Sequence, residues 1–100
     1  MRYNKLVRDR IPEYIRSKGE TAVTHIADDV EYWTKLKEKL REEVQEFVKS
    51  ETAEEIADIL EVLDAIYAYK NFDEAEIREI QARKAEEKGR FKERIILEES

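Results

Sequence analysis

Four acidic residues in the middle of the chain have the spacing that brings carboxylates together on a pair of helices. They form two pairs, Glu43-x-x-Glu46 and Glu55-x-x-Asp58. On a helix, residues three apart lie on one side about one turn apart. A turn midway between the pairs would fold the two helices back antiparallel, and the pairs would then lie level with each other. The sequence therefore predicts that four carboxylates converge.

Such a cluster is electrostatically unfavourable unless a cation is bound. Two carboxylates about 4 Å apart repel by roughly 4 kcal/mol at an effective dielectric constant near 20, so at least one pKa must rise. Mg²⁺ takes oxygen ligands and commonly shares them with substrate phosphates. The pattern predicts an Mg²⁺ site for phosphate chemistry. The alternative is a solvated acidic face, in a chain of which 44% of the residues are charged.

Capping patterns mark the helices that would position these acids. Asp28, Thr52 and Asp73 are each followed three residues later by a glutamate, which is the capping-box pattern of a helix start. A glycine at position 89 is a typical helix end. Three helices are expected, over residues 28–49, from 53 to about 70, and over 73–88.

The two ends of the chain are less regular. The segment 9–19 has a proline near its start and a glycine at its end, which predicts a short helix with Asp9 as its cap. Residues 21–27 alternate β-branched side chains with others, which predicts a short strand or an extended linker. The apolar tail 91–97 is expected to pack, as a strand against 22–26.

The two central helices each have an apolar stripe. In the first helix it consists of Val30, Trp33, Leu36, Leu40, Val44, Phe47 and Val48, which fall within an arc of roughly 120°. In the second it consists of Ile56, Ile59, Leu60, Val62, Leu63, Ile66 and Tyr67. Glu43 and Glu55 lie at the margins of these stripes, so they border the core. Glu55 also holds the capping-box position after Thr52, and its carboxylate is expected either to cap the helix or to bind metal.

Composition limits the class of protein. One hundred residues make a single domain, 1–100, too small to bury much surface alone, so self-association is expected to contribute to stability. A net charge of -6 argues against binding a nucleic acid polymer. The start lacks a signal-peptide pattern and no segment is apolar enough for a membrane span, which predicts a cytoplasmic protein.

Basic residues gather at the two ends of this acidic chain. Beside a metal centre they would supply the positive charge that a polyphosphate also needs. The candidates for phosphate contacts are Lys5, Arg8, Arg10, Arg90 and Arg94.

The central motifs resemble those of the MazG-like nucleoside triphosphate pyrophosphohydrolases. Glu42-Glu43-x-x-Glu46 followed by Glu55-x-x-Asp58 matches their E-E-x-x-E and E-x-x-D pattern. Residues 3–12 and 88–97 look like those of a small single-domain branch of the group, so the likeness spans most of the chain. The gap between the two pairs is shorter than in many members.

The resemblance implies an all-α fold: an antiparallel helical hairpin with flanking helices, whose four-helix-bundle-like core is completed by oligomerisation as a dimer or tetramer. It implies cleavage of a nucleoside triphosphate between the α and β phosphates, giving the monophosphate and pyrophosphate, to clear unwanted nucleotides. By position, the Mg²⁺ ligands would be Glu43, Glu46, Glu55 and Asp58, and Mn²⁺ is a possible substitute. Four carboxylates exceed the charge of one Mg²⁺, so two or more ions are expected. One of the four, with Glu43 foremost, or the adjacent Glu42 would orient or deprotonate the attacking water.

Three other interpretations remain open at this point. In the first, the substrate is phosphoribosyl-ATP, as in histidine biosynthesis, although Asp58 is followed by Ile59 where those enzymes usually carry Tyr-His. In the second, the substrate is a deoxynucleotide such as dUTP or dCTP. In the third, the chain is a non-catalytic helical oligomerisation module. For the lone histidine, His25, a structural role is favoured over metal binding, and for Trp33 core packing is favoured over stacking on a nucleobase.

Overall fold

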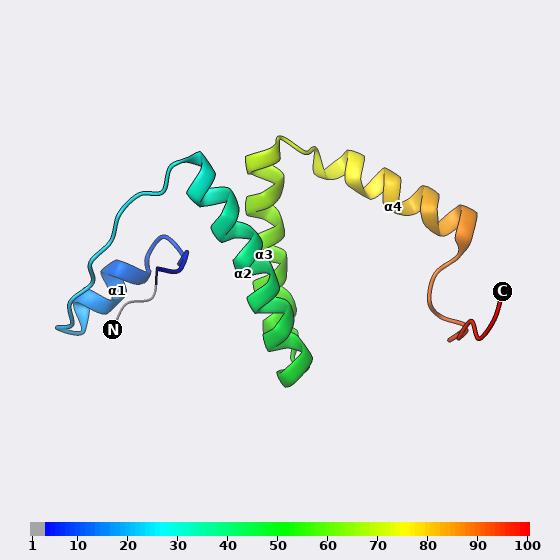
Figure 1. Cartoon of the computed structure of the whole chain (residues 1–100), viewed down its shortest axis with the longest axis horizontal. Coiled ribbons are helices and arrows are strands. Elements are labelled where there is room, and N and C mark those ends of the chain that lie inside the picture. Colours follow the sequence, from blue (N-terminus) through cyan, green and yellow to red (C-terminus); the bar gives the residue numbers. More distant parts are fainter. Residues whose placement is uncertain (1–3) are drawn as a thin grey trace.

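The regular structure in the described part of this protein is built from helices alone. The computed structural model describes residues 4–100, and within that range it contains helices and irregular segments but no strand. The all-α class expected from the sequence is confirmed (Figure 1). The helices are α1 (Ile11–Ser17), α2 (Asp29–Ser50), α3 (Ala53–Lys70) and α4 (Glu74–Lys88).

The three long helices begin where the capping patterns predict. The Asp28 side chain accepts a hydrogen bond from the backbone N–H of Glu31 at 2.9 Å, and the Thr52 hydroxyl accepts one from the N–H of Glu55 at 3.4 Å. Asp73 caps α4 through the N–H of Ala75. These bonds satisfy N–H groups that have no partner inside the helix.

A tight turn folds α2 and α3 into an antiparallel hairpin. Glu51 ends α2 in the left-handed conformation, with φ of 55°, and its N–H donates to the carbonyl of Phe47. Thr52 then returns to an extended conformation and opens α3. The hairpin and its turn are confirmed, and α2 and α3 pack along each other (Figure 1).

The core of the single chain is small. Leu36 of α2 and Val62 of α3 are buried, with 1% and 7% of their surface exposed, and they are the buried apolar residues of the described range. Much of the predicted apolar stripe stays open, since Val48 is 67% exposed and Leu60 is 49% exposed. The stripes are real, but one hairpin covers only part of each.

The open apolar residues lie on one flank of the hairpin. Val44 and Val48 follow Glu43 by one and five residues, and Ile56 and Leu60 follow Glu55 by the same steps. At about 100° per residue, all four lie about 100–140° around their helices from these carboxylates. We call these four residues the apolar flank.

The chain exposes more surface than a compact monomer of its mass. Its accessible surface is 9470 Å², whereas a folded monomer of 12.0 kDa exposes about 6,000 Å². Its radius of gyration is 18.0 Å, against about 13 Å for a compact domain of this length. A single copy therefore leaves unburied the surface that a larger core would cover.

Both ends of the chain depart from expectation. The helix α1 begins at Ile11 after Arg10, without a side-chain cap, so the prediction that Asp9 caps it is wrong. The reason is a turn that precedes the helix, in which the N–H of Ile11 donates to the carbonyl of Arg8. Residues 21–27 form the extended linker, not the strand, of the two alternatives.

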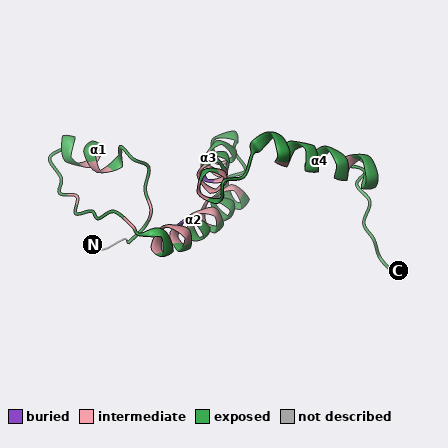
Figure 2. Ribbon diagram, turned by 90° about the horizontal axis from the view of Figure 1, so that it is seen from above, coloured by how far each residue is buried: buried purple, intermediate pink, exposed green. Residues whose placement is uncertain are grey.

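The C-terminal part extends away from the hairpin. No residue of α4 is buried, and most of α4 is exposed in Figure 2. Gly89 ends the helix with φ of 82°, as predicted. The expected pairing of 91–97 with 22–26 is wrong, because α4 carries the tail to the other side of the molecule (Figure 1). None of the helices described here is long and apolar enough to cross a membrane.

Candidate metal centre

Three of the four predicted carboxylates converge between α2 and α3. Oxygen atoms of Glu43, Glu55 and Asp58 all lie within 4.8 Å of one another. Glu43 is contributed by α2, and the other two residues by the first turns of α3. We call these three residues the acidic trio. Glu46 lies outside it and is exposed, although its charge still acts on Glu55.

Glu55 is the least favourably placed member of the acidic trio. Its Oε2 atom is buried and has no hydrogen-bond partner among the described residues. Burial raises the pKa of Glu55 above its usual value of 4.5, and the negative charges of Asp58 and Glu43 raise that pKa further. The side chain faces the other acids and does not cap its own helix. Of the two roles left open by the sequence, the capping one is not adopted.

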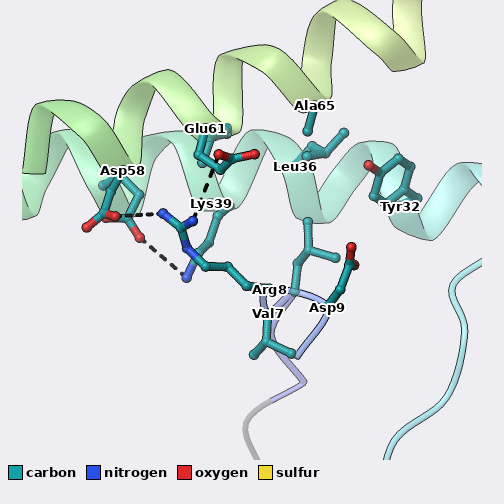
Figure 3. Close-up of a pocket in the computed structure, with 12 residues that line it drawn as sticks. Val7, Arg8, Asp9, Tyr32, Leu36, Lys39, Asp58, Glu61 and Ala65 are labelled. Atoms are coloured by element: carbon teal, nitrogen blue, oxygen red, sulfur yellow. Dashed lines mark hydrogen bonds and ion pairs between the residues drawn. The ribbon is translucent and has the colours of Figure 1, made fainter. Parts of the chain in front are cut away.

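The other two members of the acidic trio have basic neighbours (Figure 3). Arg8 donates from Nη2 to Oδ1 of Asp58 at 2.7 Å, and its Nη1 lies 3.9 Å from a carboxylate oxygen of Glu61. Lys39 lies one turn before Glu43, with Nζ 3.4 Å from its Oε1. Arg8 therefore ties the segment before α1 to the hairpin at the position of the acids.

Glu42, a candidate for handling the attacking water, lies beside the acidic trio. Its Oε1 is 3.4 Å from Nζ of Lys5 and 3.7 Å from Nζ of Lys39. The side chain of Glu42 is 35% exposed, whereas that of Glu43 is 13% exposed. Glu42 thus has access to water, and Glu43 is the more enclosed of the two.

The five predicted phosphate-contacting residues lie in three separate places. Lys5 and Arg8 lie at the acids. Arg10 lines a separate shallow hollow with residues of α1. Arg90 and Arg94 belong to the exposed C-terminal tail, away from the hairpin within one chain (Figure 1).

Two charged residues at the site, Lys39 and Glu61, are not among the site residues predicted from the sequence. Lys39 lies four residues before Glu43 and Glu61 three residues after Asp58, so the helical repeat places each of them one turn from an acid. This helical spacing is the feature of the sequence from which the two residues could have been predicted. Glu61 is at the site because Arg8 contacts it, and no spacing rule brings Arg8, from a distant part of the chain, to α3.

The lone histidine and the tryptophan have structural surroundings. His25 Nε2 is 2.9 Å from a carboxylate oxygen of Glu31, and the ring is exposed. Trp33 stacks on Tyr69, with ring centroids 5.2 Å apart and planes 5° from parallel. Lys37 and Lys70 lie over its ring. These contacts agree with the structural role favoured for His25 and with the packing role favoured for Trp33.

A cavity of about 380 Å³ adjoins the acidic trio. One end is ionic, with Arg8, Lys39 and Asp58 in its wall, and the other end is mostly apolar. The residues before α1 form one side of it and the hairpin forms the other (Figure 3). The cavity is open to solvent, so a ligand of small-molecule size has access to the carboxylates.

Comparisons with known proteins identify no family. No family model and no solved structure matches the chain. An uncharacterized protein of Mycolicibacterium smegmatis (strain ATCC 700084 / mc(2)155) is 52% identical over 48 residues, which are 48% of this chain. The match covers 49% of that relative, so the likeness spans about half of either protein.

The acidic trio fits a hard divalent cation. All its donors are carboxylate oxygens, the ligand type that Mg²⁺ and Mn²⁺ take. The buried and unpartnered oxygen of Glu55 is a donor atom without a proton donor to satisfy it. A bound cation would satisfy that oxygen and offset the repulsion that raises the pKa of Glu55.

We expect Glu55→Gln to raise the melting temperature when divalent ions are absent. The pKa of Glu55 is higher in the folded than in the unfolded protein, so the folded state binds its proton more strongly. The carboxylate therefore destabilises the fold as pH rises through that raised pKa, and this cost disappears as pH falls below about 4.5. Thermal melts in EDTA should show a larger gap between variant and wild type at pH 8 than at pH 5.

Mg²⁺ provides the matched comparison. It should raise the melting temperature of the wild type by mass action and raise that of Glu55→Gln much less. Glu54→Gln, an exposed neighbour outside the acidic trio, should behave like the wild type throughout. A melting-temperature gap independent of pH would show that the Glu55 carboxylate is not under electrostatic stress.

Proposed function

We propose that the protein is an Mg²⁺-dependent nucleoside triphosphate pyrophosphohydrolase, which releases pyrophosphate and leaves the nucleoside monophosphate. The observation that carries this proposal is the convergence of Glu43, Glu55 and Asp58, together with the buried and unpartnered carboxylate oxygen of Glu55. The resemblance of the acidic motifs to those of MazG-like enzymes supports it. Basic side chains beside the acids supply the second charge that a polyphosphate requires.

The reaction adds one water across the bond between the α and β phosphates. Mg²⁺ held by Glu43, Glu55 and Asp58 would neutralise charge on the phosphate oxygens and make water more acidic. Glu42 is open to water beside the acidic trio and is held by Lys5 and Lys39. In this proposal, Glu42 or Glu43 accepts the proton that the water loses, and the bridging oxygen leaves with pyrophosphate.

The basic residues at the site change partners in this proposal. Arg8 pairs with Asp58 and Glu61, and a bound triphosphate would offer it oxygens that match a guanidinium group. Lys39 and Lys5 stand at the same end of the cavity. Their contacts would orient the triphosphate along the carboxylates and restrain the leaving pyrophosphate.

A panel of triphosphates tests the proposal. The protein is incubated with ribo- and deoxynucleoside triphosphates and with phosphoribosyl-ATP, with Mg²⁺ or Mn²⁺, and the products are identified. We expect pyrophosphate and monophosphate in equal amounts. Release of single phosphates would indicate different chemistry, and no turnover across the panel would favour the non-catalytic oligomerisation module. Selective cleavage of phosphoribosyl-ATP would identify the histidine-pathway alternative.

A second copy is proposed to complete the core. The apolar flank consists of residues exposed by 42–67%, and the surface in excess of a compact monomer is of the order that obligate dimers bury. The carboxylates lie about 100–140° around the helices from this flank. An antiparallel pairing of two hairpins through this flank would give a four-helix bundle and leave each acidic trio accessible.

We expect Val48→Asp to shift the protein from an oligomer to a monomer. Val48 is 67% exposed in one chain, so the change costs little in a monomer. An unpaired charge buried between hairpins costs about 3 kcal/mol or more, which is roughly a hundredfold in the dissociation constant. Light scattering coupled to size exclusion measures the mass. Gln45→Asp, exposed on the polar side of α2, should leave the mass unchanged, and equal behaviour of both variants would refute this interface.

A further inference from the structure

The cavity beside the acidic trio extends along the hairpin, away from the turn between α2 and α3. We call this elongated cavity the groove. The wall includes Tyr32 in the first turn of α2 and Glu43 in its second half. These residues are 11 positions apart, which is about 16 Å along a helix. A ligand held only by its phosphates would fill the ionic end and leave the rest of this groove empty.

The far end of the groove has the character of a nucleobase site. Tyr32, Leu36, Val62 and Ala65 form an apolar wall, and pockets for small ligands are mostly apolar with a few placed polar groups. The ring of Tyr32 is held edge-on by Tyr69, with centroids 5.6 Å apart and planes 67° apart. Its orientation is therefore fixed before a ligand arrives.

A carboxylate faces this apolar end. Asp9 lines the same cavity and is directed to the space near Tyr32 (Figure 3). It makes no hydrogen bond or ion pair with residues 4–100, unlike the neighbouring Arg8. An ionised carboxylate only accepts hydrogen bonds, so the ligand edge that it recognises must donate them.

We propose that this groove binds the nucleoside half of the substrate, with the base against Tyr32 and an exocyclic amino group of the base donating to Asp9. The inference rests on the proposed function, which places the triphosphate at the acidic trio. It predicts a preference for cytosine, adenine or guanine nucleotides. Uracil and thymine are disfavoured, because two carbonyl oxygens flank the N–H of their pairing edge and would face the Asp9 carboxylate.

Binding of uncleavable ligands tests the groove apart from the reaction. The probes are α,β-methylene analogues of dCTP and dUTP, with inorganic tripolyphosphate as the probe that lacks a base, each titrated calorimetrically with Mg²⁺. The wild type should bind the dCTP analogue more tightly than the dUTP analogue. Tyr32→Ala should weaken both analogues about ten- to a hundredfold and leave tripolyphosphate unchanged. Asp9→Asn should abolish the discrimination, because an amide presents both a donor and an acceptor.

Controls separate recognition from folding. Asp9 is exposed, so Asp9→Asn should fold normally, and Tyr32→Phe keeps the ring and should bind as the wild type does. Asp64→Asn, an exposed acid on α3 outside the cavity wall, should change nothing. Base-independent binding by the wild type, or equal weakening of tripolyphosphate in Tyr32→Ala and Asp9→Asn, would overturn the inference.

The same measurements distinguish the two proposals from each other. Pyrophosphate release with no base preference and no effect of Asp9→Asn or Tyr32→Ala leaves the enzyme proposal intact and overturns the groove. Base-selective binding without turnover supports the groove and overturns the enzyme proposal. Failure of the wild type to bind any of the three probes overturns both.

Discussion

Replacing Asp58 with alanine should lower kcat for the proposed triphosphate cleavage by roughly a hundredfold to a thousandfold, the loss typical of removing one electrostatic contact to a reacting group. Asp58 belongs to the acidic trio and holds Arg8 at 2.7 Å, so the variant loses a carboxylate oxygen and misplaces a basic side chain. The side chain is 39% exposed, and the helical content seen by circular dichroism should not change. Pyrophosphate release at saturating Mg²⁺ is the measurement.

Two acidic neighbours serve as controls for Asp58→Ala. Glu54→Ala removes a negative charge one residue before Glu55 but outside the acidic trio, and it should retain wild-type activity. The sequence pattern predicts the same loss for Glu46→Ala as for Asp58→Ala. Because the structure places Glu46 outside the acidic trio, a smaller loss is expected. Full activity in Asp58→Ala would remove this residue from the site.

The hairpin was predictable because its determinants are local. The caps at Asp28 and Thr52 act within three residues, and the turn at Glu51 closes through one backbone bond to Phe47. Helical spacing then fixes which carboxylates face each other. The acidic trio follows from these short-range rules, and Glu46 departs from the predicted quartet because an ideal hairpin does not specify how far each side chain reaches.

The features that were not predicted from the sequence depend on contacts between distant segments of the chain. No spacing rule indicates that Arg8 reaches Asp58, 50 residues away along the chain. The apolar stripe of α2 correctly includes Leu36, but it also predicts burial for Val48, which is 67% exposed. The pattern identifies apolar faces without showing whether they pack within one copy or between copies. The tail after α4 was misplaced for the same reason.

Leu36→Ala should have the largest effect on stability, lowering the free energy of unfolding by about 2–5 kcal/mol. Leu36 is 1% exposed and is the most buried side chain of the hairpin. A chain with so small a core has few other contacts to compensate, and domains of this size have only about 5–15 kcal/mol of stability. Urea denaturation followed by circular dichroism, at one fixed protein concentration because the proposed oligomer makes stability concentration-dependent, gives the difference.

The matched control for Leu36→Ala is Val23→Ala, at a residue of the linker that is 93% exposed and should change stability by no more than about 0.5 kcal/mol. If the hairpin is the structural core, Leu36→Ala should also weaken Mg²⁺ binding, because Glu43 on α2 and Asp58 on α3 converge only while the two helices stay packed. Asp58→Ala, by contrast, should impair the site without unfolding the hairpin. Equal stability of Leu36→Ala and Val23→Ala would mean that contacts outside the α2–α3 interface hold the fold together.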